Sequence, residues 1–328
     1  MSCTIIPLAD PRLERWRANV GPVVTRPATF DAGQPETGWR PGSAPPPLVV
    51  VSWNVWMGRG RLVDLLTRVR AGEYARLGAP AGAPLAVLVQ EAYRAGTDIP
   101  QRTSNAAGMG LGRGFGVGED ILDVAHRLGL GLCYVPSMRN GPHASDRGNA
   151  ILSSLPLEDA CAVELPLAVQ RRVAVAATVA LPDVRGGSRR VRLVSAHLDP
   201  RGRPGLDWLG FGGRRAQAAH LLEALAPSME GVPCVLGADL NLARGHREPA
   251  WARLEAAGFG FGLPPRAPLW THTYHALPKL VIDYLLVRDP EDAVARMDVH
   301  RLDEHPHDAG RTVFGSDHHP LLGTLEPR

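Results

Sequence analysis

The chain has 328 residues, of which 45% are hydrophobic and 21% are charged, the composition of a globular protein with a sizeable core. The formal net charge of +3 is too small to indicate nucleic-acid binding by itself. The four cysteines have no paired spacing, which argues against a disulfide framework or a zinc site. There is no secretion signal at the N-terminus and no apolar stretch of roughly 20 residues, so we expect a cytoplasmic protein without a membrane helix.

Residues 1–47 contain no clear strand or long helix, and they end in the proline-rich run of residues 41–47. Such a run favours an extended arm laid over the surface or left mobile. Residues 48–328 contain no obvious linker or short-period repeat. We therefore expect one domain, residues 48–328, preceded by an N-terminal arm.

Apolar runs typical of buried strands recur from residue 48 onward, with helical patterns between only some of them. We expect strands at residues 48–54, 85–90, 131–134, 149–153, 172–180, 190–196, 232–237, 281–287 and 320–325. We expect helices at residues 61–77, 119–128 and 213–225. In the last helix the spacing places Ala216, Ala219, Leu222 and Leu225 on one side and Arg214, Arg215 and Glu223 elsewhere. This irregular alternation favours an α/β sandwich of mixed sheets over an all-parallel sheet.

Two segments lack periodicity and are expected to be loops that influence substrate choice. Residues 94–118 are rich in glycine and are interpreted as a long loop near the functional edge, with disorder as the alternative. Residues 199–213 form the second loop.

Polar residues recur immediately after apolar runs. Asn54, Glu91 and His197 each follow one; Asp239 and Asn241 follow another, and Asp317 and His318 precede the last. Taken singly, each has a structural explanation as a turn residue, a helix cap or a buried histidine. Together they predict a shared cleft at the ends of several strands.

Asp283 is harder to explain as a turn residue, because it lies inside the apolar run of residues 281–287. Burying a neutral polar group without a hydrogen bond costs roughly 2–7 kcal/mol, and burying an unpaired carboxylate costs more. A cationic partner is therefore required, and His318 is a candidate.

The residue types fit the hydrolysis of a phosphate ester. Oxygen ligands from Glu91, Asn54 and Asp317 suit Mg²⁺, with Mn²⁺ as an alternative, and do not suit zinc. Two histidines, His197 and His318, on opposite sides of a phosphorus atom would supply a base and an acid for in-line attack by water.

Seven short motifs occur in the order found in the endonuclease/exonuclease/phosphatase superfamily, which the chain resembles over about residues 48–326. They are residues 52–54, 90–91, 148–153, 195–198, 237–241, 282–284 and 316–318. The superfamily includes pancreatic-type deoxyribonucleases, abasic-site endonucleases, neutral sphingomyelinases and inositol polyphosphate phosphatases. The resemblance implies a four-layer α/β/β/α sandwich and Mg²⁺-dependent phosphoester hydrolysis.

The resemblance also assigns roles to the cation ligands and to the water-holding pair. By it, Glu91 is the principal metal ligand, and Asn54 and Asp317 complete or support the site. Asp239 and Asn241 resemble the pair that orients the attacking water and holds the scissile phosphate.

The two histidines differ in what the resemblance implies for them. His318, and not His319, matches the essential histidine, with Asp283 fixing its tautomer and stabilising its charged form. His197 occupies a position that is tyrosine in abasic-site endonucleases and histidine in deoxyribonuclease-like and sphingomyelinase-like members. It is expected to act as the general acid or as a donor to the leaving oxygen. Its acidic partner stays open, since Asp199 lies very close to it in sequence.

Three classes of function follow. A nuclease would use arginines near the strand ends to contact flanking phosphates; these are Arg59, Arg61, Arg201 and Arg203, although the small net charge favours solvated surface arginines. A phospholipid or small-phosphoester hydrolase would use an apolar lip made of Trp208, Leu209 and Phe211, although such residues more often pack a loop onto the body. A non-catalytic scaffold is disfavoured, because every expected catalytic position is filled.

Overall fold

The computed structural model describes residues 2–29, 45–103, 118–182, 187–202, 205, 207–261, 270–273, 280–292, 297–305 and 311–326. Within these ranges the strands form two mixed sheets, each with seven strands. None of the described helices is long and apolar enough to cross a membrane.

The first sheet is built around strand β3, the expected strand that begins at Leu48. Its order is β13 (Asp298–Arg301), β14 (Leu321–Leu325), β3 (Leu48–Asn54), β4 (Leu85–Ala95), β6 (Ser145–Ser153), β5 (Gly131–Arg139) and β2 (Val24–Arg26). The β3–β4 pair is parallel, and the other pairs are antiparallel.

The second sheet carries the strands that end at His197 and Asp239. Its order is β1 (Thr4–Ile6), β7 (Glu158–Glu164), β8 (Val173–Pro182), β9 (Ser188–His197), β10 (Cys234–Asp239), β12 (Asp283–Arg288) and β11 (Gly260–Phe261). The β1–β7 and β9–β10 pairs are parallel, and the others are antiparallel.

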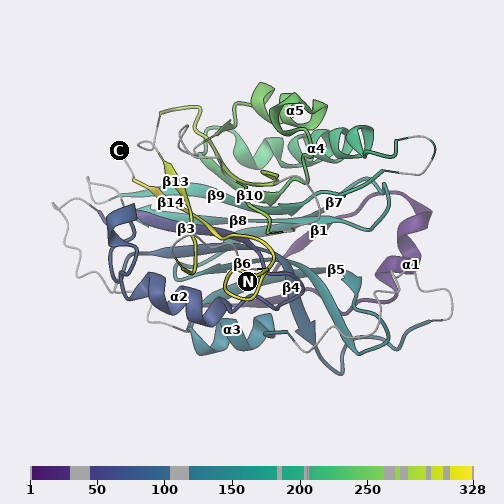
Figure 1. The fold of residues 1–328 in the computed structure, drawn as a ribbon, viewed down its shortest axis with the longest axis horizontal. Helices are drawn as coiled ribbons and strands as arrows, with labels where there is room; N and C mark the ends of the chain where they lie inside the picture. Colours follow the sequence, from purple (N-terminus) through teal and green to yellow (C-terminus); the bar gives the residue numbers. More distant parts are fainter. Residues whose placement is uncertain are drawn as a thin grey trace.

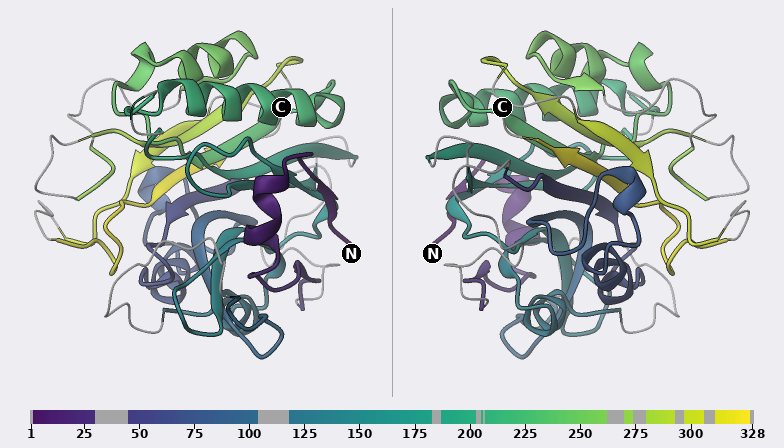
Figure 2. Two further views of the ribbon diagram at one scale, coloured as in Figure 1. Left: turned by 90° about the vertical axis from the view of Figure 1, so that its right-hand side faces the viewer. Right: turned by 90° about the vertical axis from the view of Figure 1, so that its left-hand side faces the viewer.

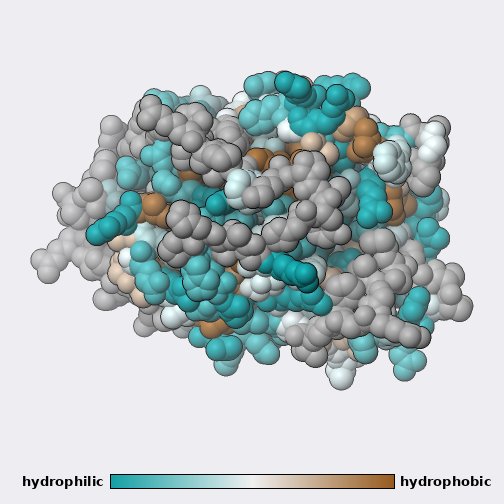
Figure 3. Space-filling view, viewed as in Figure 1, coloured by the Kyte–Doolittle hydropathy of each residue, from teal (hydrophilic) through white to brown (hydrophobic). Residues whose placement is uncertain are grey.

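Helices cover the outer face of each sheet (Figures 1 and 2). Helices α2 (Leu62–Arg70) and α3 (Ile121–Arg127) pack on the first sheet, while α4 (Phe211–Leu225) and α5 (Pro249–Ala256) pack on the second. The outward side of α5 is hydrophilic (Figure 3). The predicted four-layer α/β/β/α sandwich is confirmed. The short elements are α1 (Glu14–Arg17), η1 (Pro11–Leu13), η2 (Ala75–Leu77), η3 (Ala226–Met229) and η4 (Gly245–Arg247).

Strand β3 shows why its sequence is continuously apolar. Leu48 and Val50 face the core between the two sheets, whereas Val49, Val51 and Trp53 face the core beneath α2 and α3. Successive side chains of a strand point to opposite faces, so a strand with a covered layer on both sides needs apolar residues at every position.

The N-terminal segment differs from the expected strand-free arm. β1 adds to the edge of the second sheet beside β7, and β2 adds to the edge of the first sheet beside β5. Both strands have only three residues, which is too short for a clear pattern of alternation. The proline-rich run lies partly outside the described residues, and the boundary at residue 47 stays a prediction.

Several elements extend beyond, or stop short of, their predicted bounds. The helix expected at residues 61–77 ends at Arg70 and is followed by a turn and η2. β4 continues through the expected loop start to Ala95, with a register shift between Val89 and Ala92. The glycine-rich residues 104–117 lie outside the described residues.

The apolar side predicted for α4 coincides only in part with its buried face: Leu225 is buried, and Ala219 and Leu222 are half-buried. Ala216 is exposed, whereas Arg214 is completely buried and forms two hydrogen bonds to the Glu248 carboxylate at 2.9 and 3.0 Å. Gln217 is also buried and bonds Asp199. Because charged and amide groups can be buried when they are fully paired, apolar spacing alone does not reveal that Arg214 and Gln217 belong to the buried face.

Candidate active site

Sheet register brings three predicted catalytic residues side by side. Asp239 at the end of β10 pairs with His197 on the parallel strand β9 and with Asp283 on the antiparallel strand β12. All three side chains are buried. His197 and Asp283 lie 42 and 44 positions from Asp239 in the sequence, so it is the pairing of strands that makes them neighbours.

Asp239 is the residue on which the site converges. Its Oδ2 accepts a hydrogen bond from Asn54 Nδ2 at 2.9 Å, across the two sheets, and lies 3.2 Å from His197 Nε2. Its Oδ1 accepts from the backbone N–H of Asn241 at 3.1 Å. Burial and the neighbouring Asp283 carboxylate raise the pKa of Asp239 to about 7. Its carboxylate is therefore a stronger base than an exposed aspartate.

His318 pairs with Asp283, as the sequence predicted. Its Nδ1 lies 2.9 Å and 3.1 Å from the two Asp283 oxygens, and its Nε2 lies 3.9 Å from Asp239 Oδ2. Burial lowers the pKa of His318, but the Asp283 carboxylate, followed by Asp317 and Asp239, raises it to about 10. These carboxylates therefore favour the charged form of His318.

The backbone around His318 is held by the end of β3. The Ser316 hydroxyl donates to the Asn54 carbonyl at 2.7 Å and accepts from the His318 N–H at 3.1 Å. Trp53 Nε1 donates to the His318 carbonyl at 2.8 Å. These bonds connect the loop before β14 to the strand that carries Asn54.

His197 has a partner that sequence reasoning missed. Arg172, just before β8, places Nη1 3.0 Å from His197 Nδ1, and its Nε donates to Asp199 at 3.2 Å. Burial, and next the charge of Arg172, hold the pKa of His197 well below its ordinary value. No local pattern marks Arg172, which stands 25 residues from His197. Of the two roles expected for His197, this contact favours the hydrogen-bond donor over the general acid.

His272 is the second residue that sequence reasoning missed. Its Nε2 lies 3.6 Å from Asp317 Oδ2, and its ring meets the His318 ring edge-on with 4.7 Å between centroids. Burial raises the pKa of Asp317, but the hydrogen bond from His272 and the charges of His318 and His272 lower it overall. His272 lies outside every recognised motif, so only its contacts identify it.

The oxygen donors fit a divalent cation. Asp317 Oδ1 is buried without a hydrogen-bond partner among the described residues, and it lies 3.8 Å from His318 Nε2. A cation would satisfy that oxygen. Asn54 Oδ1 accepts from the Trp56 N–H at 3.0 Å and retains a second lone pair.

Glu91 occupies an unusual backbone position. It lies at the register shift of β4 with a φ of 54°, in the left-handed region that residues other than glycine rarely adopt. Its charge opposes the pKa lowering that burial causes in Arg147. Such backbone strain is common at functional sites. The carboxylate–histidine clusters found among the described residues do not include Glu91, so its role as a ligand stays a prediction.

The residues predicted to contact substrate have different surroundings in the structure. Arg61 forms ion pairs with Glu304 and Asp64, and Arg59 lies over the Trp56 ring, 4.1 Å from its centroid. Arg61 is thus already paired, and Arg203 lies outside the described residues. Trp208 and Leu209, at 72% and 49% exposure, do not pack onto the body.

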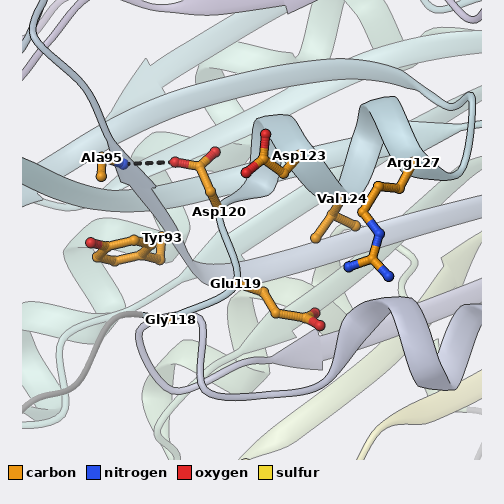
Figure 4. A pocket seen from close by; sticks show the side chains of 8 residues that line it. All are labelled: Tyr93, Ala95, Gly118, Glu119, Asp120, Asp123, Val124 and Arg127. Carbon is orange, nitrogen blue, oxygen red and sulfur yellow. Dashed lines mark hydrogen bonds between the residues drawn. The ribbon is translucent and has the colours of Figure 1, made fainter.

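A separate cavity of about 440 Å³ lies between the end of β4 and α3 (Figure 4). Tyr93, Glu119 and Asp120 line it, and Asp120 accepts a hydrogen bond from the Ala95 N–H at 2.8 Å. None of the predicted catalytic or metal residues is among its described lining residues.

Solved structures of low sequence identity share the fold. An endonuclease/exonuclease/phosphatase from Beutenbergia cavernae is 20% identical, with a TM-score of 0.56 over 86% of this chain and 72% of its own. The human Nocturnin catalytic domain, solved with a bound sulfate anion, is 17% identical, with a TM-score of 0.53 over 88% and 100%. A truncated Caenorhabditis elegans TDP2 is 16% identical, with a TM-score of 0.51 over 85% and 98%.

No curated protein matches the chain with significant similarity. The family model described as Endonuclease/Exonuclease/phosphatase family matches residues 51–318. That range runs from β3 to the Asp317–His318 pair and includes every predicted site residue. The chain therefore belongs to the endonuclease/exonuclease/phosphatase family.

Proposed function

We propose that this protein is a phosphodiesterase that uses a divalent cation, Mg²⁺ or Mn²⁺, to hydrolyse phosphodiester bonds of nucleic acid. The observation that carries the proposal is the approach of Asn54, His197 and His318 to one buried carboxylate, Asp239. A phosphodiester is anionic, so its hydrolysis needs positive charge or hydrogen-bond donors at the phosphate oxygens and a base for the attacking water. This cluster supplies both kinds of group.

Asp239 and His318 have opposite roles in proton transfer: Asp239 is the acceptor and His318 is the donor. Asp239, with its raised pKa, accepts a proton from the attacking water as the new P–O bond forms. His318 is charged and contacts Asp283 through Nδ1. Its Nε2–H donates a hydrogen bond to a phosphate oxygen, and it transfers this proton to the leaving oxygen as the ester bond breaks. His197 adds an uncharged donor.

Glu91, Asn54 and Asp317 are the residues that would hold the cation. When bound, it supplies positive charge that offsets the charge of the phosphate and of the leaving oxygen. The unpartnered Asp317 Oδ1 supports this assignment.

The test is turnover of bis(p-nitrophenyl) phosphate in Mg²⁺, Mn²⁺, Ca²⁺ or EDTA. We expect activity with Mg²⁺ or Mn²⁺, and a loss of about 10²–10⁴-fold in kcat for Glu91→Gln and for His318→Gln. Glu158→Gln, on the exposed start of β7, is the matched control and should keep wild-type activity. A folded wild-type protein with no turnover under any of these conditions would contradict the proposal and favour a scaffold.

A second candidate, hydrolysis of a phospholipid, rests on the exposed side chains Trp208 and Leu209 after the His197 strand. Plasmid nicking and cleavage of a choline phospholipid in vesicles separate the two substrates. For a nuclease, Trp208→Ala should leave nicking unchanged, and nicking should weaken steeply as salt rises. Vesicle cleavage that is lost in Trp208→Ala, without plasmid nicking by the wild type, would select the phospholipid instead.

A further inference from the structure

The hydrogen bond between Arg172 and His197 determines which ring nitrogen of the histidine carries the proton. Arg172 Nη1 lies 3.0 Å from His197 Nδ1, and both side chains are buried. A guanidinium has only N–H donors and keeps its charge in proteins. Nδ1 must therefore be the acceptor, which leaves the ring proton on Nε2.

The Nε2 atom faces the catalytic centre. It lies 3.2 Å from Asp239 Oδ2, the same oxygen that accepts from Asn54 Nδ2. A carboxylate oxygen is an acceptor, so the Nε2–H tautomer gives a matched donor and acceptor at this contact. In the opposite tautomer, the Nδ1–H donor would face the Arg172 N–H donor, and the Nε2 acceptor would face the Asp239 carboxylate oxygen.

Arg172 is itself held in place from behind. Its Nε donates to Asp199 Oδ1 at 3.2 Å, and the fully buried Asp199 accepts at Oδ2 from the Val169 N–H at 3.0 Å. Gln217, from α4, donates to the same Asp199 oxygen at 3.2 Å and accepts from the Asp199 N–H at 2.9 Å. The guanidinium therefore has a fixed position between an acid and the histidine.

We propose that Arg172 is a positioning residue that holds His197 as the uncharged Nε2–H tautomer, so that this histidine donates a hydrogen bond to the phosphate or leaving oxygen. A histidine backed by a carboxylate is stabilised as imidazolium, as His318 is by Asp283. A histidine backed by a guanidinium is not, because two cations would then adjoin in a buried place.

The lowered pKa of His197 agrees with this arrangement, since burial and Arg172 both disfavour its charged form. The catalytic consequence rests on the proposed phosphodiesterase function. The tautomer itself does not, because it can be measured without substrate.

The first experiment is a two-bond ¹H–¹⁵N correlation spectrum of the full chain labelled with ¹⁵N-histidine, without substrate or added metal. The His197 signals are assigned by their absence in His197→Gln. We expect a neutral ring with the proton on Nε2. A proton on Nδ1, or a charged ring, at pH 7 in the wild type would overturn the proposal without any further variant.

The second experiment removes the arginine together with its acidic partner, so that no unpaired charge is left buried. In Arg172→Met/Asp199→Asn we expect the Nε2–H preference to be lost, with kcat reduced about 10–100-fold and KM little changed. Arg171→Met is the matched control. Arg171 directly precedes Arg172 and is equally buried, but it pairs with Glu164 instead of Asp199.

The outcomes separate the two proposals. Retention of the Nε2–H tautomer in the double variant, or its loss in Arg171→Met as well, would overturn the role of Arg172. Absence of phosphodiesterase activity in the wild type would contradict the proposed function, while the tautomer measurement would still decide the arrangement at His197.

Discussion

Two adjacent histidines in the loop before β14, His318 and His319, have different partners. His318 faces Asp283 and Asp239, whereas His319 Nδ1 lies 2.8 Å from Asp303 Oδ1 and 3.3 Å from the Leu302 carbonyl. Consecutive residues in extended backbone point in opposite directions, so only one of the pair can face Asp283 and Asp239. The motif singled out His318, and its contacts agree with that choice.

The corresponding prediction compares His318→Gln with His319→Gln. His318→Gln should lose about 10²–10⁴-fold in kcat, because a charged donor is removed from the site. His319→Gln should keep most of its activity but lose about 1–3 kcal/mol of unfolding free energy, since a buried hydrogen bond is broken. Steady-state kinetics and guanidinium unfolding measure the two effects. Equal losses of kcat in two folded variants would contradict the separation.

At the scale of elements, the N-terminal segment is attached to the sandwich by a buried charge cluster. Glu164, at the end of β7, binds Arg17 of α1 and Arg171, and its carboxylate accepts from the Leu8 N–H at 3.1 Å. Burial raises the pKa of Glu164, but the hydrogen bonds and charges of Arg17 and Arg171 lower it overall. The arm-like segment is thus held by paired charges that its own sequence does not reveal.

This cluster predicts a pH-dependent contribution to stability. Because the pKa of Glu164 is lower in the folded chain than the unfolded value of about 4.3, its contribution is fully present above that pH and is lost as the pH falls further. Glu164→Gln should cost about 3 kcal/mol at pH 7, and the difference from wild type should shrink below about pH 4.

Urea unfolding of both proteins from pH 3 to pH 7 measures this difference. Glu158→Gln, on the same strand but exposed, should show only a small and nearly constant effect. A wild-type advantage over Glu164→Gln that grows on acidification would contradict the assignment.

At the scale of the whole molecule, the residues predicted to be catalytic lie where the two sheets meet. Asn54 belongs to the first sheet, and Asp239, His197 and Asp283 belong to the second. Carboxylates gathered at one place repel each other unless positive charge offsets them. A cation bound there should therefore stabilise the folded sandwich as a unit.

We expect Mg²⁺ or Mn²⁺ at about 100 times its dissociation constant to add about 2.7 kcal/mol, a rise in Tm on the order of 5 °C. Glu91→Gln and Asp317→Asn should lose most of this rise, whereas Glu158→Gln should keep it. Differential scanning calorimetry with and without EDTA measures the shift. An identical rise in all four proteins would indicate non-specific binding and would contradict the assigned ligands.

The sequence by itself determined an α/β sandwich of mixed sheets and the set of chemical groups, and the family resemblance implied its four layers. Apolar runs such as residues 48–53 specify strands buried on both faces, and the polar residues after them occur in a recognisable order. These features are local in the chain, and they depend on side-chain periodicity and motif spacing. The Asp283–His318 pair could also be predicted from the sequence, because a carboxylate in an apolar strand requires a partner.

Only the tertiary structure decided the partners of those groups. Arg172 beside His197, His272 beside Asp317 and Arg214 buried against Glu248 join residues without a shared local pattern. The physical reason is that pairing buried charges depends on which side chains meet across strands and loops. Apolar periodicity records burial of apolar surface, and it does not record where a buried charge finds its counter-charge.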